Sequence, residues 1–219
     1  MSLPTMVTCS QCEGIERQFG RRTAQWELRR FRKRGPAPTT RLLIDALRRE
    51  GLSGASILDI GGGVGAIYHE LFASGAHDAV HVDVSPDYLK VAREEAERRG
   101  HADHVQFVHA DFVELAPTLP EADIVTLDRV ICCYPDMDRL VELSATKTRR
   151  LFGAVYPRET WWTRTALRLV NVFNRLRRSA FRTYLHSPAA IDAVLRAQGL
   201  ERRYLVHTLM WNVVVYAKL

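Results

Sequence analysis

The sequence predicts a doubly wound α/β fold, built on a mostly parallel sheet whose last two strands form an antiparallel hairpin. Three observations support this prediction. Residues 56–65 join an apolar run to four glycines, the pattern of a buried strand that turns sharply into a helix. Segments of strand length and helix length then alternate toward residue 199. The apolar segments 201–208 and 211–218 are too close for a crossover, so they must pair as a hairpin.

Length and composition favour one α/β domain. The chain has 219 residues, of which 47% are hydrophobic and 26% charged. We expect residues 1–52 to form an N-terminal helical cap and residues 53–219 the core, with a helical insertion at about 158–185. No apolar stretch approaches the ~20 residues of a membrane helix, and residues 1–10 lack a secretory-signal pattern, so we expect a cytoplasmic location.

The individual elements follow from local signals. Two helices precede the sheet, and the second is entered through Pro38-Thr39. Ser85-Pro86 supplies an N-cap and a first-turn proline for a helix that ends at Gly100. Ser187-Pro188 starts another helix in the same way. The helices are expected at 14–34, 39–50, 64–74, 86–100, 159–178 and 188–199, and the strands before the hairpin at 56–60, 79–83, 105–108, 124–127 and 151–156.

The glycine turn would bring the backbone close to a ligand. Gly61-x-Gly63-x-x-Ala66 also satisfies a dinucleotide fingerprint, so the glycines alone do not identify the cofactor. Asp59 narrows the choice, because a carboxylate just below the turn would repel a pyrophosphate but attract an ammonium or sulfonium cation. S-adenosylmethionine carries both of these cations.

Asp59-x-Gly61-x-Gly63-x-Gly65 resembles the first motif of class I S-adenosylmethionine-dependent methyltransferases, and the later segments follow in that family's order over roughly residues 55–219. The resemblance implies a Rossmann-like methyltransferase fold with a seven-stranded sheet, and S-adenosylmethionine as cofactor. It implies ribose binding by the acid at the end of the second strand and adenine binding by the segment after the third strand. It also implies a lid formed by the N-terminal helix, with Phe19 and Trp26 as candidate lid residues, and the alternative is that both side chains pack on the sheet. The cofactor-binding residues expected are Asp59, Gly61, Gly62, Gly63, Gly65, Asp83, Val84, Asp111, Phe112, Asp128 and Phe19.

Residues 128–136 follow the fourth strand, at the edge where the methyl acceptor would sit. This segment is similar to that of small-molecule methyltransferases, including magnesium-protoporphyrin O-methyltransferases, which often carry a histidine at the position of Cys132. The cysteine leaves the general base open, with Tyr134, His109 and His186 as candidates. The substrate residues expected are Arg129, Cys133, Tyr134, Arg158, Trp161 and Trp162.

The predicted helix 159–178 is amphipathic. Trp162, Ala166, Leu169, Phe173 and Leu176 share one face, and four arginines, Arg164, Arg168, Arg175 and Arg178, share the other. One interpretation is a helix packed on the core with a solvated arginine face. The other is an element that covers the substrate or touches a membrane surface.

These patterns favour an enzyme that transfers the methyl group of S-adenosylmethionine to a small or medium-sized molecule. A carboxylate or an acidic hydroxyl is the expected acceptor group, because a carboxylate is ionised at neutral pH and needs no base. An RNA or DNA methyltransferase is an alternative that the net charge of +6 supports, but the proline motif of amino-group DNA methyltransferases is missing after the fourth strand. A non-catalytic cofactor-binding protein stays open as an alternative.

The cysteines do not predict a metal centre. Cys9-x-x-Cys12 has the spacing of zinc ligands, but no second such pair exists, and the adjacent Cys132 and Cys133 chelate one ion poorly. Methylation of a metalloid bound to Cys132 and Cys133 is a further alternative. Peripheral membrane contact and the oligomeric state are left open by the sequence.

Overall fold

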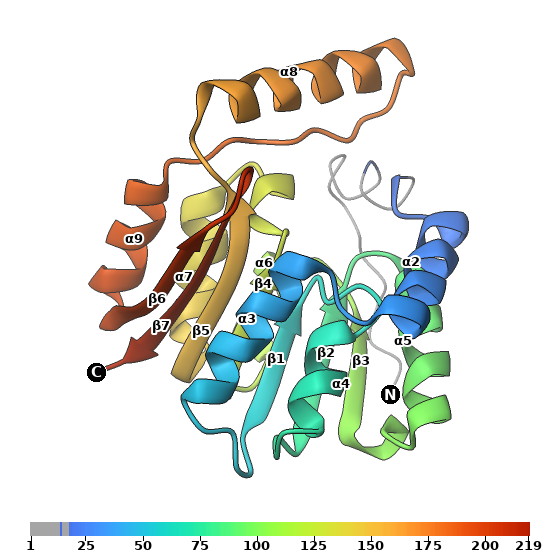
Figure 1. The fold of residues 1–219 in the computed structure, drawn as a ribbon, viewed down its shortest axis with the longest axis vertical. Coiled ribbons are helices and arrows are strands. Elements are labelled where there is room, and N and C mark those ends of the chain that lie inside the picture. The colour runs from blue at the N-terminus through green and yellow to red at the C-terminus, as the bar shows by residue number, and fades with distance from the viewer. Residues whose placement is uncertain (1–13, 15–17) are drawn as a thin grey trace.

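The structure is a computed structural model that describes Gly14 and residues 18–219 (Figure 1). Seven strands form one sheet in the order β3-β2-β1-β4-β5-β7-β6. Neighbouring strands from β3 to β5 are parallel, and β7 is antiparallel to both β5 and β6. The predicted fold class is therefore confirmed. The strands are β1 (Ser56–Ile60), β2 (Asp78–Asp83), β3 (Val105–His109), β4 (Ala122–Asp128), β5 (Thr148–Pro157), β6 (Leu200–His207) and β7 (Trp211–Lys218).

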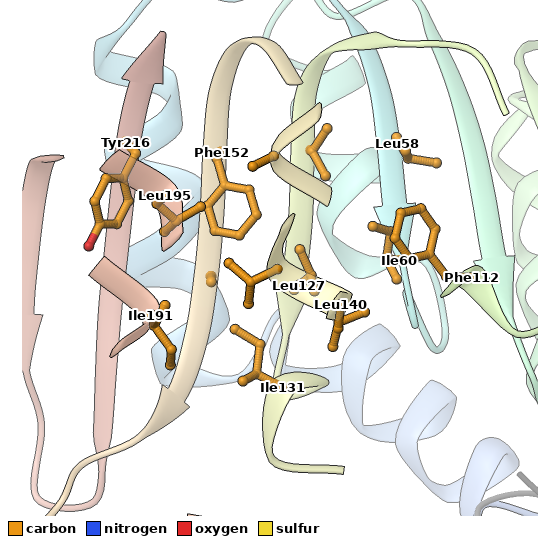
Figure 2. Close-up of a cluster of buried hydrophobic side chains, with 14 of the residues drawn as sticks. Leu58, Ile60, Phe112, Leu127, Ile131, Leu140, Phe152, Ile191, Leu195 and Tyr216 are labelled. Carbon is orange, nitrogen blue, oxygen red and sulfur yellow. The ribbon is translucent and has the colours of Figure 1, made fainter. Parts of the chain in front are cut away.

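Helices cover both faces of the sheet (Figure 1). One face packs against α3 (Pro38–Arg49) and α4 (Ala66–Phe72), which contribute Leu43, Leu47 and Leu71 to the core. The other face packs against α6 (Phe112–Leu115), α7 (Met137–Thr146) and α9 (Pro188–Ala197). Figure 2 shows this second core, where Leu127 and Phe152 of the sheet lie among Leu140, Ile191 and Leu195 of the helices. Burial of such side chains contributes about 1.5–3 kcal/mol each to folding.

Local chemistry sets the bounds of α5 (Pro86–Arg99). The Ser85 hydroxyl accepts a hydrogen bond from the Tyr88 backbone N–H at 3.3 Å, and Gly100 ends the helix at a φ of 72°. Both features match the prediction. By contrast, α4 is shorter than predicted, because the left-handed Gly65 (φ 78°) keeps the glycine turn out of the helix until Ala66.

The sequence interpretation did not include α7. This helix supplies the crossover between the parallel strands β4 and β5. Its first turn is capped by Asp136, whose carboxylate accepts a hydrogen bond from the Arg139 backbone N–H at 3.0 Å. The side chains of Leu140 and Val141 are completely buried against the sheet.

The predicted amphipathic helix forms as α8 (Trp161–Leu176), but its apolar stripe does not pack on the core. Leu169, Phe173 and Leu176 are 65%, 51% and 79% exposed, and Figure 1 shows α8 standing apart from the sheet. The buried side chains of α8 are Thr163 and Asn174. The core-packing interpretation is therefore wrong. Polar residues of α8 face the body of the protein and hydrogen-bond the segment that follows the helix, as in the 3.3 Å bond from Asn174 Nδ2 to the Phe181 carbonyl.

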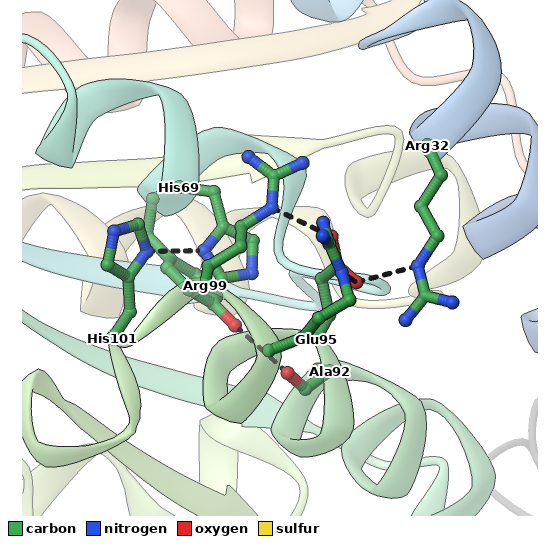
Figure 3. A network of polar contacts seen from close by, with 8 residues as sticks. Arg32, His69, Ala92, Glu95, Arg99 and His101 are labelled. Carbon is green, nitrogen blue, oxygen red and sulfur yellow. Dashed lines mark hydrogen bonds and ion pairs between the residues drawn. The ribbon is translucent and has the colours of Figure 1, made fainter.

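The first described helix, α2 (Arg21–Arg34), is fastened beside α5 by ion pairs (Figure 3). Glu95 is fully buried, and its carboxylate pairs with Arg32 at 2.8 Å, Arg98 at 2.6 Å and Arg99 at 2.7 Å. The Arg99 guanidinium also lies 4.7 Å from the centre of the Phe31 ring. These contacts hold α2 above the carboxyl edge of the sheet.

The remaining predictions for the N-terminus, including those for Cys9 and Cys12, concern residues that lie outside the described part of the chain. Among residues 18–219, no helix is both long and apolar enough to span a membrane.

Candidate functional site

A cavity of about 430 Å³ lies at the carboxyl edge of the sheet, beside the point between β1 and β4 where the strand order reverses. Ligands of doubly wound folds bind at this position. The cavity is lined by residues from the glycine turn, from the ends of β2 and β4, and from the N-terminal helices α2 and α3. The predicted site residues among its lining are Phe19, Gly61, Gly62, Gly63, Asp83, Val84, Asp111, Phe112, Asp128, Arg129, Cys133 and Tyr134.

The glycine turn is compact because its backbone lies directly on buried polar side chains. A Cβ atom added to Gly62 would collide with the Asp59 carboxylate and lie 2.6 Å from the His81 ring. Gly61 and Gly63 have φ values of 60° and 58°, which side chains rarely adopt. The turn therefore presents bare backbone to the cavity, as a bound cofactor would require.

Asp59 lies beneath this turn and does not line the cavity. Its carboxylate is fully buried and accepts a 2.6 Å hydrogen bond from the Thr126 hydroxyl. The second oxygen has no hydrogen-bond partner among the described residues, and His81 Nδ1 is 3.8 Å away. Asp59 can therefore act on a cation above the turn through its field, without direct contact.

Asp83 faces the cavity from the end of β2. Its carboxylate accepts hydrogen bonds from the backbone N–H groups of Gly63 at 3.1 Å and Ser85 at 2.8 Å. Burial raises the pKa of Asp83, while His81 and the two backbone N–H groups act in the opposite direction. A buried acceptor that joins two loops in this way is suited to the hydroxyl groups of a ribose.

The segment after β3 forms a second wall. Asp111 caps α6 by accepting a 2.9 Å hydrogen bond from the Val113 backbone N–H, and its other oxygen accepts one from the Tyr134 hydroxyl at 3.1 Å. The Phe112 ring is buried beside them. A carboxylate next to an aromatic ring fits the amino group and the face of an adenine.

The cap closes the cavity with residues that the sequence interpretation missed. The Tyr88 hydroxyl of α5 donates a 2.6 Å hydrogen bond to Glu27 of α2, and the Thr40 hydroxyl of α3 donates to Asp128 at 2.5 Å. Burial raises the pKa of Tyr88, and the Glu27 carboxylate raises it further, so the phenol stays a donor. Nothing local in the sequence marks these residues, since their roles depend on which helix folds over which strand.

The far end of the cavity carries Arg129 and two thiols. Arg129 adopts a φ of 63°, pairs with Asp128 at 3.2 Å and lies 3.7 Å from Glu27. The sulfur atoms of Cys132 and Cys133 are 3.9 Å apart. A hydrogen bond from Cys132 lowers the pKa of Cys133 and Arg129 lowers it further, whereas that bond and burial raise the pKa of Cys132. Cys133 is thus the more acidic thiol.

Two of the three candidate bases lie outside the cavity lining. His109 Nε2 is 2.9 Å from the Val84 carbonyl, and His186 Nε2 is 2.9 Å from the Tyr134 carbonyl. In each imidazole this nitrogen must donate to the carbonyl, which leaves Nδ1 as the nitrogen that could accept a proton. Tyr134 does line the cavity.

Three of the predicted substrate residues also lie outside this lining. The Arg158 guanidinium donates to the Thr208 carbonyl at 2.8 Å, and the Trp162 indole N–H donates to the Leu209 carbonyl at 3.2 Å. Trp161 is 75% exposed. From α8, Leu167 reaches the cavity instead. Gly65 is the N-cap residue of α4 and lies outside the lining as well.

Comparisons with known proteins agree with this geometry. Residues 57–149 match the family model described as a methyltransferase domain. The ribosomal protein L11 methyltransferase of Geobacter metallireducens is 33% identical over 117 residues, which are 53% of this chain and 35% of that protein. The corresponding protein of Photorhabdus laumondii is 32% identical over 91 residues, which are 42% and 30% of the two chains. The chain thus spans about a third of the length of these relatives.

Solved structures resemble the chain over more of its length. Magnesium protoporphyrin IX methyltransferase from Synechocystis PCC 6803, with bound SAH, superposes with a TM-score of 0.72 at 17% identity, covering 95% of this chain and 100% of that one. An O-methyltransferase family 2 protein from Planctomyces limnophilus, in complex with apigenin, superposes with a TM-score of 0.66 at 18% identity. The match covers 90% of this chain and 62% of that one. Residues 57–149 are therefore similar to a methyltransferase domain, and the chain has the same fold as these solved methyltransferase structures.

Proposed function

We propose that the chain binds S-adenosylmethionine and transfers its methyl group to an oxygen atom of a small or medium-sized acceptor. One observation carries the proposal. A single cavity joins an acidic end, with Asp83 and Asp111 after β2 and β3, to a far end after β4 with the Asp128–Arg129 pair, two thiols and apolar side chains. The acidic end suits a cofactor with cationic and hydroxyl groups, and the far end leaves room for an acceptor beside it.

At the acidic end, Asp83 would hold the ribose and Asp111 with Phe112 the adenine. Gly61, Gly62 and Gly63 would lie against the methionine part of the cofactor, above the charge of Asp59. These assignments rest on position in the fold and on the hydrogen-bonding capacity of each group. S-adenosylmethionine supplies an activated methyl group, so the protein has to orient the acceptor in line and exclude water.

The acceptor end favours a group that is already anionic. His109 and His186 lie outside the cavity lining, and the Tyr134 hydroxyl donates to Asp111. A carboxylate acceptor loses no proton when it becomes an ester, so it needs none of these side chains as a base. This is the reason for proposing a carboxylate or an acidic hydroxyl over a neutral alcohol.

A protein substrate is the second candidate, because the relatives with the higher identity are named for methylation of ribosomal protein L11. Incubation with S-adenosylmethionine labelled in its methyl group, with and without small organic acids and purified ribosomal protein L11, separates the two. Product that extracts into organic solvent and is released by mild base supports a methyl ester. Label that stays on the protein under base supports the second candidate, and transfer to neither would contradict both.

A further inference from the structure

An open groove of about 700 Å³ adjoins the cavity at the mouth between α2 and the turn that joins β6 to β7. The two spaces share five lining residues, which are Glu27, Arg30, Ala37, Arg129 and Trp211. The groove therefore opens into the far end of the cavity, where the proposed acceptor would lie. A molecule that reaches the methyl group from this side must pass these residues.

The charges in the groove are unequal. Its lining holds two arginines, Arg30 and Arg129, and one acid, Glu27. Arg129 is neutralised by Asp128 at 3.2 Å and by Glu27 at 3.7 Å, and Glu27 also accepts from Tyr88. Arg30 is half-buried and makes no hydrogen bond or ion pair with the residues that the structure describes. A guanidinium without a counter-charge at such a mouth favours an anionic ligand.

The walls of the groove are broad and apolar. Trp26 of α2 is 59% exposed on one side, and Leu209, 74% exposed, lies with Met210 and Trp211 on the other. Arg158 fixes this turn twice, through its guanidinium to the Thr208 carbonyl and through its backbone N–H to the Met210 carbonyl, both at 2.8 Å. The exposed Trp26 ring and the half-buried Trp211 ring offer flat surfaces for an aromatic ligand.

We propose that this groove binds the methyl acceptor, with an anionic group held by Arg30 and a ring-containing apolar body against Trp26 and the 208–211 turn. The inference rests on the proposed methyl transfer and specifies its substrate class. The group held by Arg30 is not the one that is methylated, since pairing with a guanidinium lowers the basicity of a carboxylate. The acceptor therefore carries an anionic group in addition to the oxygen that attacks the methyl carbon.

A matched pair of probes tests this groove. 2-Naphthoate and 2-naphthamide share one ring system and differ in charge, and their binding to the full chain saturated with S-adenosylhomocysteine can be measured by quenching of tryptophan fluorescence. We expect naphthoate to bind at least about tenfold more tightly than naphthamide. Arg30→Gln should remove this preference and leave the affinity for naphthamide unchanged. Arg30→Lys should restore part of it, because lysine keeps the charge but not the planar fork.

Arg29→Gln is the control, since Arg29 is exposed on the same helix and lines neither space. It should leave the binding of both probes unchanged, whereas Trp26→Ala should weaken both equally. Equal affinities of the two probes for the wild-type chain, or no binding of either at millimolar concentration, would overturn the proposal. A loss of S-adenosylhomocysteine binding in Arg30→Gln would reassign Arg30 to the cofactor. Methyl transfer by the wild-type chain in any of these cases would leave the proposed function standing.

Discussion

The Arg32 guanidinium of α2 lies 2.8 Å from the Glu95 carboxylate of α5, although the two residues are 63 positions apart in the sequence. Arg98 and Arg99 bind the same fully buried carboxylate, and Figure 3 shows Arg32 and Arg99 on either side of Glu95. One glutamate thus joins the cap helix to a helix of the sheet layer. This contact adds to the apolar packing of Leu28 and Phe31 against Tyr88 and Val91, which also holds α2 beside α5.

Glu95→Gln should destabilise the fold. The substitution weakens the hydrogen bonds from three arginines that are themselves partly exposed, so the free energy of unfolding should fall by roughly 2 kcal/mol. Urea denaturation at neutral pH measures the change in the free energy of unfolding. Glu94→Gln serves as the control, because Glu94 is exposed on the same helix. Equal stability of the two variants would show that the cluster does not hold the cap.

The same cluster predicts a dependence of stability on pH. Burial alone would raise the pKa of Glu95, but hydrogen bonds from Arg98, Arg99 and Arg32 outweigh it and lower the pKa from 4.5 to about 2. Because the folded pKa lies below the unfolded one, the stabilisation is complete above about pH 4.5 and is lost as the pH falls toward 2. The difference in urea midpoint between wild type and Glu95→Gln should shrink across this window. A constant difference would contradict the depressed pKa.

The sequence predicted best those elements that local chemistry determines. The bounds of α5 follow from Ser85, Pro86 and Gly100, whose capping roles need no tertiary contact. The strand-end residues meet at one cavity because the carboxyl ends of parallel strands share an edge. The helix α7 could also have been found, since Asp136 precedes a run with Leu140 and Val141 at helical spacing.

Other features depend on tertiary contacts that no short pattern records. Periodicity identified the apolar stripe of α8, but it could not tell which face of the helix meets the body of the protein. Glu27 and Tyr88 meet only because α2 folds across α5. The bond from Arg158 to the Thr208 carbonyl likewise depends on the hairpin turning back over the start of α8. The substrate roles expected for Arg158, Trp161 and Trp162 stay predictions.

Gly62→Ala should destabilise the fold through a steric clash. The new methyl group would overlap the Asp59 carboxylate and lie 2.6 Å from His81, and both residues are fully buried and cannot move aside. Gly100→Ala is the matched control, because it adds only left-handed backbone strain of about 1 kcal/mol, and no contact of the described residues lies within 4 Å of the new Cβ. Thermal denaturation should therefore show a larger fall in Tm for Gly62→Ala than for Gly100→Ala. The reverse order would rule out the close packing of the turn.

Phe19→Ala should speed the release of the cofactor product. The Phe19 ring lies edge-on to Tyr88 at 6.1 Å and to Phe181 at 5.6 Å, and it forms part of the cavity wall. Its loss should raise the dissociation rate of S-adenosylhomocysteine by about tenfold in stopped-flow experiments, whereas Phe19→Leu should change it less. Hydrogen exchange at residues 18–20 that is unchanged by saturating S-adenosylhomocysteine would contradict the role of this segment as a lid.

Asp83 offers the most direct test of the cofactor end of the cavity. Its carboxylate accepts from Gly63 and Ser85 and would accept from both ribose hydroxyls. Asp83→Ala should therefore weaken cofactor binding by on the order of 2–4 kcal/mol, which is roughly a hundredfold in Kd. Asp123→Ala removes a carboxylate that hydrogen-bonds Ser56 at the opposite end of β1 and serves as the control.

Calorimetric titration of the full chain with S-adenosylhomocysteine, and separately with NAD, tests the central claim. The cavity at the end of β1 predicts saturable binding of S-adenosylhomocysteine at one site, weakened in Asp83→Ala, unchanged in Asp123→Ala, and no binding of NAD. Tight binding of NAD with no affinity for S-adenosylhomocysteine would contradict the claim, because the glycine turn would then serve a dinucleotide.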